Sequence, residues 1–392
     1  MTLWRRLAAC ALAIVTLASL TGCGTSARDS ARGVQPTAQN TAPLVDPGTP
    51  LGGVRAPSFV LTDQFGSKVS LRTFRGRAVL LAFLDSRCTT ICPLTSVEML
   101  LARRALGRLA RREVALVAID ANPTATAVSD VYAYSKAHGM LHDWWFLTAG
   151  KRTLNRVWRE YGMAVAIEHG AIDHTPAVYL IDARGRERRV YMTQLAYAAV
   201  GQQARVFANA LARVIPAPTA GSRAVLRRGL GTVPGVLEPG QVALPVMTAR
   251  GPAGTYEVRT GRAVLFVFFA TWLSEFGSVA RQLKALNRYE AVARTDHLPG
   301  VVAVDEAQTE PSPGALRGLL RRTGRLSYPV VVDTQGTLAD SLGVEDGTWY
   351  TLLGVNGRIL WQHDGSNNWV GPVALLQRVR TAIARATSRS SR

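Results

Sequence analysis

A repeated pattern constrains the fold of this chain more than any other feature of its sequence. Residues 76–84 read GRAVLLAFL, and residues 261–269 read GRAVLFVFF, an offset of 185 positions. Further along, residues 178–186 (VYLIDARGR) match residues 350–358 (YTLLGVNGR) with an offset of 172. The apolar runs within these matches are typical of buried strands. Two copies of one fold in the same chain explain both matches.

Strand and helix patterns alternate in the first copy. Buried strands are predicted near residues 78–84, 114–119 and 177–182. Between and after them, apolar residues recur at helical spacing, most clearly over 94–111 and 195–214. This alternation predicts an α/β fold, a central mixed β-sheet flanked by helices. Since 392 residues exceed the usual size of a single core, we predict two such domains in tandem, residues 51–216 and 241–392, joined by a linker at 217–240.

The N-terminus has the pattern of an export signal. Arg5 and Arg6 precede an apolar run at residues 7–20, which is too short for a comfortable membrane span. The run ends in Leu-Thr-Gly-Cys23, which resembles a bacterial lipobox, so residues 1–22 are the predicted signal peptide and Cys23 the lipidated residue. The alternatives are ordinary signal cleavage and an uncleaved anchor. Residues 23–50 are rich in Ser, Thr, Ala, Pro and Gly and read as a flexible tether.

Net charge narrows the choice of partners. The chain carries a formal charge of +19. For a protein held by lipid on the extracytoplasmic face of the cell membrane, periplasmic or outer, we expect no nucleic-acid partner. Attraction to an anionic membrane surface is one use of the charge, and an arginine-rich solvated surface is the other interpretation.

Two cysteines lie where chemistry is expected. Cys88 and Cys92 follow the first buried strand directly, and Pro93 then opens a helical pattern. Proline suits the first turn of a helix. Thiols near the positive end of a helix dipole have a lowered pKa and favour the thiolate. Such a pair can bind a soft metal, exchange disulfides or form a crosslink.

Residues 56–206 resemble the Sco/SenC family of thioredoxin-like copper proteins. The resemblance rests on the C-x3-C-P motif at Cys88 and Cys92, on the Asp-His-Thr group around His174 and on the YLID strand after it. It implies a thioredoxin-like fold with one copper ion, Cu(I) or Cu(II), held by Cys88, Cys92 and His174. It further implies a metallochaperone that helps to assemble the copper centre of cytochrome c oxidase. The expected partner is oxidase subunit II, or another copper or thiol protein.

Two residues near His174 bear on the mechanism. Asp173 could orient the imidazole, as carboxylates often do for metal-bound histidines, or it could cap a turn. Pro176 lies nine residues before Gly185, the spacing at which thioredoxin-like oxidoreductases place a cis-proline. That position favours the alternative function, an extracytoplasmic thiol-disulfide oxidoreductase that uses Cys88 and Cys92. Whether the protein is an enzyme therefore stays open at this point.

The second copy resembles the TlpA/ResA-like thioredoxin branch from about residue 244 to 386. Residues 269–272 (FATW) match the lead-in to that branch's cysteine pair, but the cysteine positions hold Leu273 and Phe276. The cis-proline position holds Thr348. A scaffold without thiols cannot perform this redox or copper chemistry. We predict that the second copy serves to bind a partner or to position the first.

Overall fold

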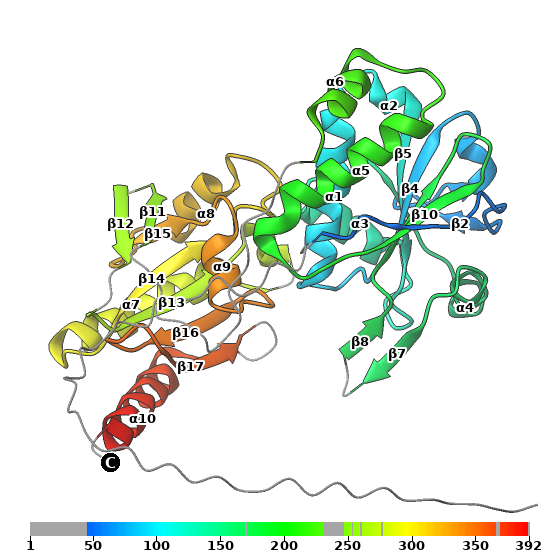
Figure 1. The fold of residues 1–392 in the computed structure, drawn as a ribbon. Coiled ribbons are helices and arrows are strands. Elements are labelled where there is room, and N and C mark those ends of the chain that lie inside the picture. Colours follow the sequence, from blue (N-terminus) through cyan, green and yellow to red (C-terminus); the bar gives the residue numbers. More distant parts are fainter. Residues whose placement is uncertain are drawn as a thin grey trace, which may run out of the picture. The chain divides into compact units, whose positions relative to one another are not determined.

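A computed structural model describes residues 45–168, 171–230, 247–252, 254–258, 261–275, 277–365 and 369–390 (Figure 1). All of them belong to one compact unit, residues 38–392. The signal peptide, Cys23 and most of the tether lie outside these residues. Across the described ranges, no helix is long and apolar enough to span a membrane.

The first region, residues 45–230, is built on a six-stranded sheet in the order β1-β10-β9-β4-β5-β6. Strand β4 lies parallel to β5 and antiparallel to β9, and all seven of its residues are buried. The strands are β1 (Thr49–Pro50), β4 (Ala78–Leu84), β5 (Val114–Asp120), β6 (Trp145–Leu147), β9 (Ala177–Ile181) and β10 (Glu187–Met192). Two hairpins stand beside this sheet, β2 (Val60–Thr62) with β3 (Lys68–Ser70) and β7 (Val165–Glu168) with β8 (Ala171–His174).

Helices cover both faces of this sheet, as the period-two alternation of a strand requires. Leu80 packs in one core with Met99 of α1 and Phe207 of α5, while Leu81 packs in the other with Leu154 and Trp158 of α4. The helices are η1 (Leu71–Phe74), α1 (Ile91–Ala105), α2 (Ala110–Glu113), α3 (Val128–Ala137), α4 (Lys151–Glu160), η2 (Tyr197–Ala199), α5 (Val200–Val214) and α6 (Ala220–Arg228).

The second region, residues 247–390, repeats the arrangement. Its sheet has the order β12-β11-β15-β14-β13-β16-β17. Strand β13 is parallel to β14 and antiparallel to β16, as β4 is to β5 and β9. The strands are β11 (Met247–Gly251), β12 (Gly254–Val258), β13 (Val264–Phe269), β14 (Gly300–Asp305), β15 (Val330–Val332), β16 (Trp349–Leu353) and β17 (Ile359–Asp364). The helices are η3 (Thr271–Glu275), α7 (Val279–Thr295), α8 (Ala315–Thr323), α9 (Thr337–Ser341) and α10 (Pro372–Ser390).

This shared strand order confirms the predicted fold class, α/β with two thioredoxin-like sheets in tandem. The apolar runs of the sequence repeat are the central strands β4 and β13, and the second pair of matched segments begins at the second residue of β9 and of β16.

Two predicted irregular segments contain regular structure. Within the predicted tether, Thr49 and Pro50 pair with β10, and the Asp46 carboxylate accepts hydrogen bonds from the backbone N–H groups of Gly48 and Met192 at 2.7 and 2.6 Å. Ordered structure therefore begins before residue 50. Within the predicted linker lies α6, whose first turn is capped because the Thr219 hydroxyl oxygen accepts a hydrogen bond from the Ser222 N–H at 2.9 Å.

Glu98 provides a test of the core. Its side chain is buried in α1, and one carboxyl oxygen has no hydrogen-bond partner in the described part of the chain. Burial raises the pKa of Glu98 from 4.5 to about 8. The folded chain therefore keeps this proton up to pH 8, whereas the unfolded chain releases it above pH 4.5, so the free energy of unfolding falls as pH rises between these values.

Replacement of Glu98 by Gln should remove this pH dependence. We expect the variant to match the parent near pH 4 and to exceed it by as much as about 3 kcal/mol at pH 7, measured by urea unfolding. The exposed Glu345→Gln serves as the control and should leave the profile unchanged. Parallel profiles for Glu98→Gln and the parent would contradict the burial of a protonated carboxyl.

Candidate metal and thiol site

The two thiols lie at the corner between β4 and α1. The Cys88 N–H donates to the Asp85 carbonyl at 3.1 Å, which turns the chain back after the strand. Cys88 is partly exposed in this loop, and its Sγ lies 3.2 Å from Thr90 Oγ1. Cys92 is the second residue of α1 and is fully buried. Pro93 occupies the first helical turn, where a missing N–H costs no hydrogen bond. The corner predicted from the sequence is therefore present.

His174 reaches this corner from the end of β8, ahead of β9. It is the last residue of β8, two positions before Pro176, and its Nε2 lies 3.8 Å from the Cys92 Sγ. Its Nδ1 lies 3.2 Å from the Thr175 carbonyl oxygen. A carbonyl can only accept, so Nδ1 carries the proton and Nε2 presents a lone pair toward Cys92. That tautomer is the one a metal ligand needs.

Distances at the site bear on metal binding. In protein zinc sites, sulfur and imidazole nitrogen bind at about 2.3 and 2.0 Å, and one ion can bridge donors separated as Cys92 and His174 are. Among the residues described, however, no three Cys, His, Asp or Glu side chains form a group that could hold a metal ion as it stands. Cys88 contacts both the Thr90 hydroxyl and the Cys92 side chain. Ligation by all three residues therefore stays a prediction.

The two thiols differ in acidity. A hydrogen bond with the Cys92 side chain lowers the pKa of Cys88, although burial opposes that effect. Burial raises the pKa of Cys92 well above its usual value. Burial also lowers the pKa of His174, which keeps the imidazole neutral. The site thus combines an accessible acidic thiol with a buried, weakly acidic one.

The His174 Nδ1 contacts a backbone carbonyl and not Asp173, and Pro176 does not follow a cis peptide bond. Asp173 is exposed, and the His174 Nδ1 bonds to the Thr175 carbonyl instead. The backbone of the following residue, not a carboxylate, orients the imidazole. The cis peptide bond found in the described residues is Gly347–Thr348 in the second region, and the bond before Pro176 is not cis.

The second region touches the thiol loop. The Thr89 hydroxyl donates to the Asp346 carboxylate, and Asp346 also accepts from the Gly347 N–H at 2.7 Å. A hollow of about 470 Å³ lies between the loop and the second region, with Arg87 and Thr89 on one side and Leu273 and Thr348 on the other. Leu273 of the second region therefore lines the same hollow as the thiol loop of the first region. Phe276 lies outside the described residues.

Further contacts hold the second region against the first. Both Asp340 carboxylate oxygens accept backbone hydrogen bonds, from Tyr197 and Ala198, at 2.8 and 2.7 Å. Leu94 and Tyr197 share one buried apolar cluster with Phe266 of β13. Because polar and apolar contacts occur together, the two regions are joined by a packed interface rather than by the chain alone.

Sequence reasoning missed Thr89 and Asp346 as a pair. No motif of the sequence marks Thr89 or Asp346. A separation of 257 positions leaves no local pattern that could connect them.

Together, the fold and the site define a thioredoxin-like domain with a thiol pair and a neighbouring histidine. Residues 51–208 match the model of the SCO1/SenC family, which confirms the resemblance of the first region to that family. The TlpA/ResA likeness of the second region stays a prediction.

Solved structures similar to this chain include three with related descriptions. ScoI of Bradyrhizobium japonicum with copper bound is 22% identical over 41% of this chain and 100% of that one, with a TM-score of 0.36. BsSco, described as a member of the Sco family of cytochrome c oxidase assembly proteins, is 20% identical over 41% and 95%, with a TM-score of 0.33. The thioredoxin domain of a Bacteroides vulgatus thiol-disulfide oxidoreductase is 19% identical over 35% and 86%, with a TM-score of 0.28. No curated protein matches the chain.

The unequal thiols predict unequal reactivity. We expect iodoacetamide to alkylate Cys88 at least about tenfold faster than Cys92 at pH 7, because thiolate fraction and exposure both favour Cys88. Timed alkylation followed by peptide mass spectrometry measures the two rates. Denaturation in urea should equalise them, and this is the internal control. Equal rates in the folded protein would contradict the described corner.

Proposed function

We propose that the first region binds one copper ion through Cys88, Cys92 and His174 and passes it to a partner protein. The observation that carries this proposal is the 3.8 Å approach of Cys92 Sγ to His174 Nε2 beside a second thiol. Thiolates suit Cu(I), and imidazole suits both copper states. Copper supplies no chemistry to this chain beyond being held and released.

Binding requires the chain to make small adjustments. Both thiols lose their protons, and Cys88 Sγ exchanges its contact with the Thr90 hydroxyl for the ion. The Thr175 carbonyl keeps the Nδ1 proton in place, so that Nε2 remains available. A three-donor set leaves one side of the ion open, and ligands of a partner can enter there. An open side is what transfer to another protein requires.

The family match supports a more specific assignment. We assign the protein to the assembly of the copper centre of cytochrome c oxidase, with subunit II or another copper or thiol protein as recipient. We place it on the extracytoplasmic face of the membrane, attached by a lipid on Cys23. These assignments follow from the SCO1/SenC match to residues 51–208 and from the lipobox pattern at the N-terminus.

A copper titration tests the site. The reduced protein should bind one Cu(I) in competition with a chromophoric chelator, and His174→Ala should weaken binding at least about tenfold, since about 1.4 kcal/mol corresponds to each tenfold step. His142→Ala is the matched control, because His142 is an exposed histidine of the same region. If His174→Ala binds copper as tightly as His142→Ala does, His174 is not a ligand.

Thiol exchange is the second candidate, favoured by one partly exposed and one buried cysteine. In that reaction the Cys88 thiolate attacks a partner disulfide and forms a mixed disulfide. Cys92 then displaces the partner, which leaves with two reduced sulfurs, and a Cys88–Cys92 disulfide remains. One reducing pair is consumed for each disulfide reduced, so a second thiol donor must restore the protein.

The reduction potential separates this candidate from a structural crosslink. Equilibration with glutathione or dithiothreitol buffers gives the potential of the Cys88–Cys92 pair. A value well below about −300 mV indicates a structural disulfide and would exclude exchange, whereas a higher value together with turnover of a disulfide substrate would support it.

We also propose that the second region positions the thiol loop. Thr89, which donates the hydrogen bond to Asp346, lies in the loop that joins the two thiols. The shared cluster around Tyr197 packs the two regions together. A fixed loop lowers the entropy lost when Cys88 joins the other ligands. The second region then affects affinity without providing a ligand.

A double-mutant cycle tests this role. Thr89→Val and Asp346→Ala should each weaken Cu(I) binding about three- to tenfold, and the double variant should be no weaker than either one, because both remove the same hydrogen bond. Glu345→Ala, at the neighbouring exposed carboxylate, should have no effect. Additive losses in the double variant would show that the two side chains act separately.

A further inference from the structure

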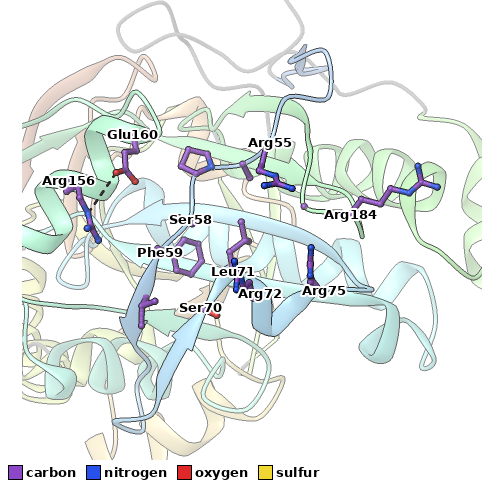
Figure 2. Close-up of a pocket in the computed structure, with 14 residues that line it drawn as sticks. Arg55, Ser58, Phe59, Ser70, Leu71, Arg72, Arg75, Arg156, Glu160 and Arg184 are labelled. Atoms are coloured by element: carbon purple, nitrogen blue, oxygen red, sulfur yellow. Dashed lines mark ion pairs between the residues drawn. The ribbon is translucent and has the colours of Figure 1, made fainter.

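A second concave site lies in the first region, away from the thiols. Its volume is about 820 Å³, and four separate segments form its walls. These are the chain leading into β2, the end of β3 with the turn after it, α4, and the turn between β9 and β10. Five arginines line the hollow: Arg55, Arg72, Arg75, Arg156 and Arg184. Figure 2 shows their side chains around Phe59 and Leu71.

The positive charge of this arginine pocket is poorly neutralised. Glu160 is the single acidic residue in its lining, and its Oε1 lies 3.9 Å from the Arg156 Nε. The guanidinium groups of Arg55, Arg72, Arg75 and Arg184 make no ion pair within the described residues. By contrast, Arg103 and Arg111 of the same region both pair with Asp143. All five arginines are exposed, so water and salt screen much of their repulsion, and a bound anion would neutralise the charge that remains.

The frame of the pocket is fixed by hydrogen bonds between distant segments. The Ala56 N–H donates to the Gly185 carbonyl and the Gly76 N–H to the Ala183 carbonyl, both at 3.0 Å. The Tyr161 hydroxyl donates to the Pro57 carbonyl at 2.9 Å. Phe59 is buried and provides an apolar floor. The backbone positions of the arginines are therefore set before any ligand arrives.

The chemistry of the lining defines the ligand. Every cationic residue here is arginine, whose planar guanidinium forms paired hydrogen bonds with phosphate and carboxylate oxygens. The volume exceeds that of a single phosphate ion, and the apolar floor suits a carbon skeleton. We propose that the arginine pocket binds a phosphate-bearing anion, either a soluble phosphate ester or the headgroup of an anionic phospholipid.

This site is distinct from the proposed copper site. Val79 near the start of β4 pairs with Ile181, so the pocket turn at Arg184 lies at the beginning of the strand, whereas the thiol loop follows its end. Six residue steps of about 3.3 Å separate these ends by roughly 20 Å. Ligand binding in the pocket thus leaves the thiols accessible, and the two proposals can fail independently.

Two binding measurements test the pocket, both on the protein carrying Cys23→Ser, so that no acyl chain contributes. Calorimetry with pyrophosphate probes a soluble phosphate ligand, and cosedimentation with phosphatidylglycerol vesicles, compared with phosphatidylcholine vesicles, probes a headgroup. We expect Arg72→Gln/Arg75→Gln to weaken binding at least tenfold in the arm that shows binding. Arg104→Gln/Arg108→Gln removes the same charge from exposed positions of the same region and should weaken it less than about twofold.

Each outcome decides the question. Binding of pyrophosphate alone identifies a soluble ligand, and binding of phosphatidylglycerol vesicles alone identifies a headgroup. Binding of both supports the shared phosphate chemistry. No binding in either arm, or equal losses in the two double variants, would overturn the proposal. Cu(I) affinity should be the same in both double variants, which separates this test from that of the copper site.

Discussion

The buried central strand β4 is the constraint on which the rest of the first region depends. All its residues are buried, because β5 and β9 flank it and helices cover both faces. The loop that follows β4 therefore lies at the end of the sheet where β4 finishes, and that loop carries Cys88. The antiparallel neighbour β9 begins at that same end of the sheet, so the segment before β9 brings His174 close to the thiol loop. The Cys92–His174 contact follows from this strand pairing.

The same strand order in the second region leads to a different outcome. Strand β13 ends at the same kind of corner, where Leu273 is buried, and the corner faces the thiol loop. In the second region this part of the molecule is a contact surface, with Asp340 and Asp346 accepting hydrogen bonds from the first region. Burial of Asp340 raises its pKa to about 6, so this interface contains a carboxyl group whose pKa lies close to neutral pH.

Sequence patterns predicted the structural features that arise from local periodicity in the chain. The strands β4 and β13, the corner at Cys92 and the repeat itself are short-range features with strong apolar signals. Helix α6 was not predicted, because its sequence is short and polar and its stability comes from capping by Thr219 and packing on α1, where Gly221 approaches the Leu106 carbonyl. The Thr89–Asp346 contact and the arginine pocket join segments far apart in the chain, and no window of sequence contains them.

The central claim is that Cys88, Cys92 and His174 together hold copper, although the described side chains do not yet surround an ion. X-ray absorption spectroscopy of the Cu(I)-loaded protein tests it directly, because the extended fine structure counts sulfur and nitrogen neighbours separately. The account predicts two sulfur neighbours and one imidazole nitrogen, with the nitrogen lost in His174→Ala. A site with sulfur neighbours alone, or a nitrogen that persists in His174→Ala, would contradict it.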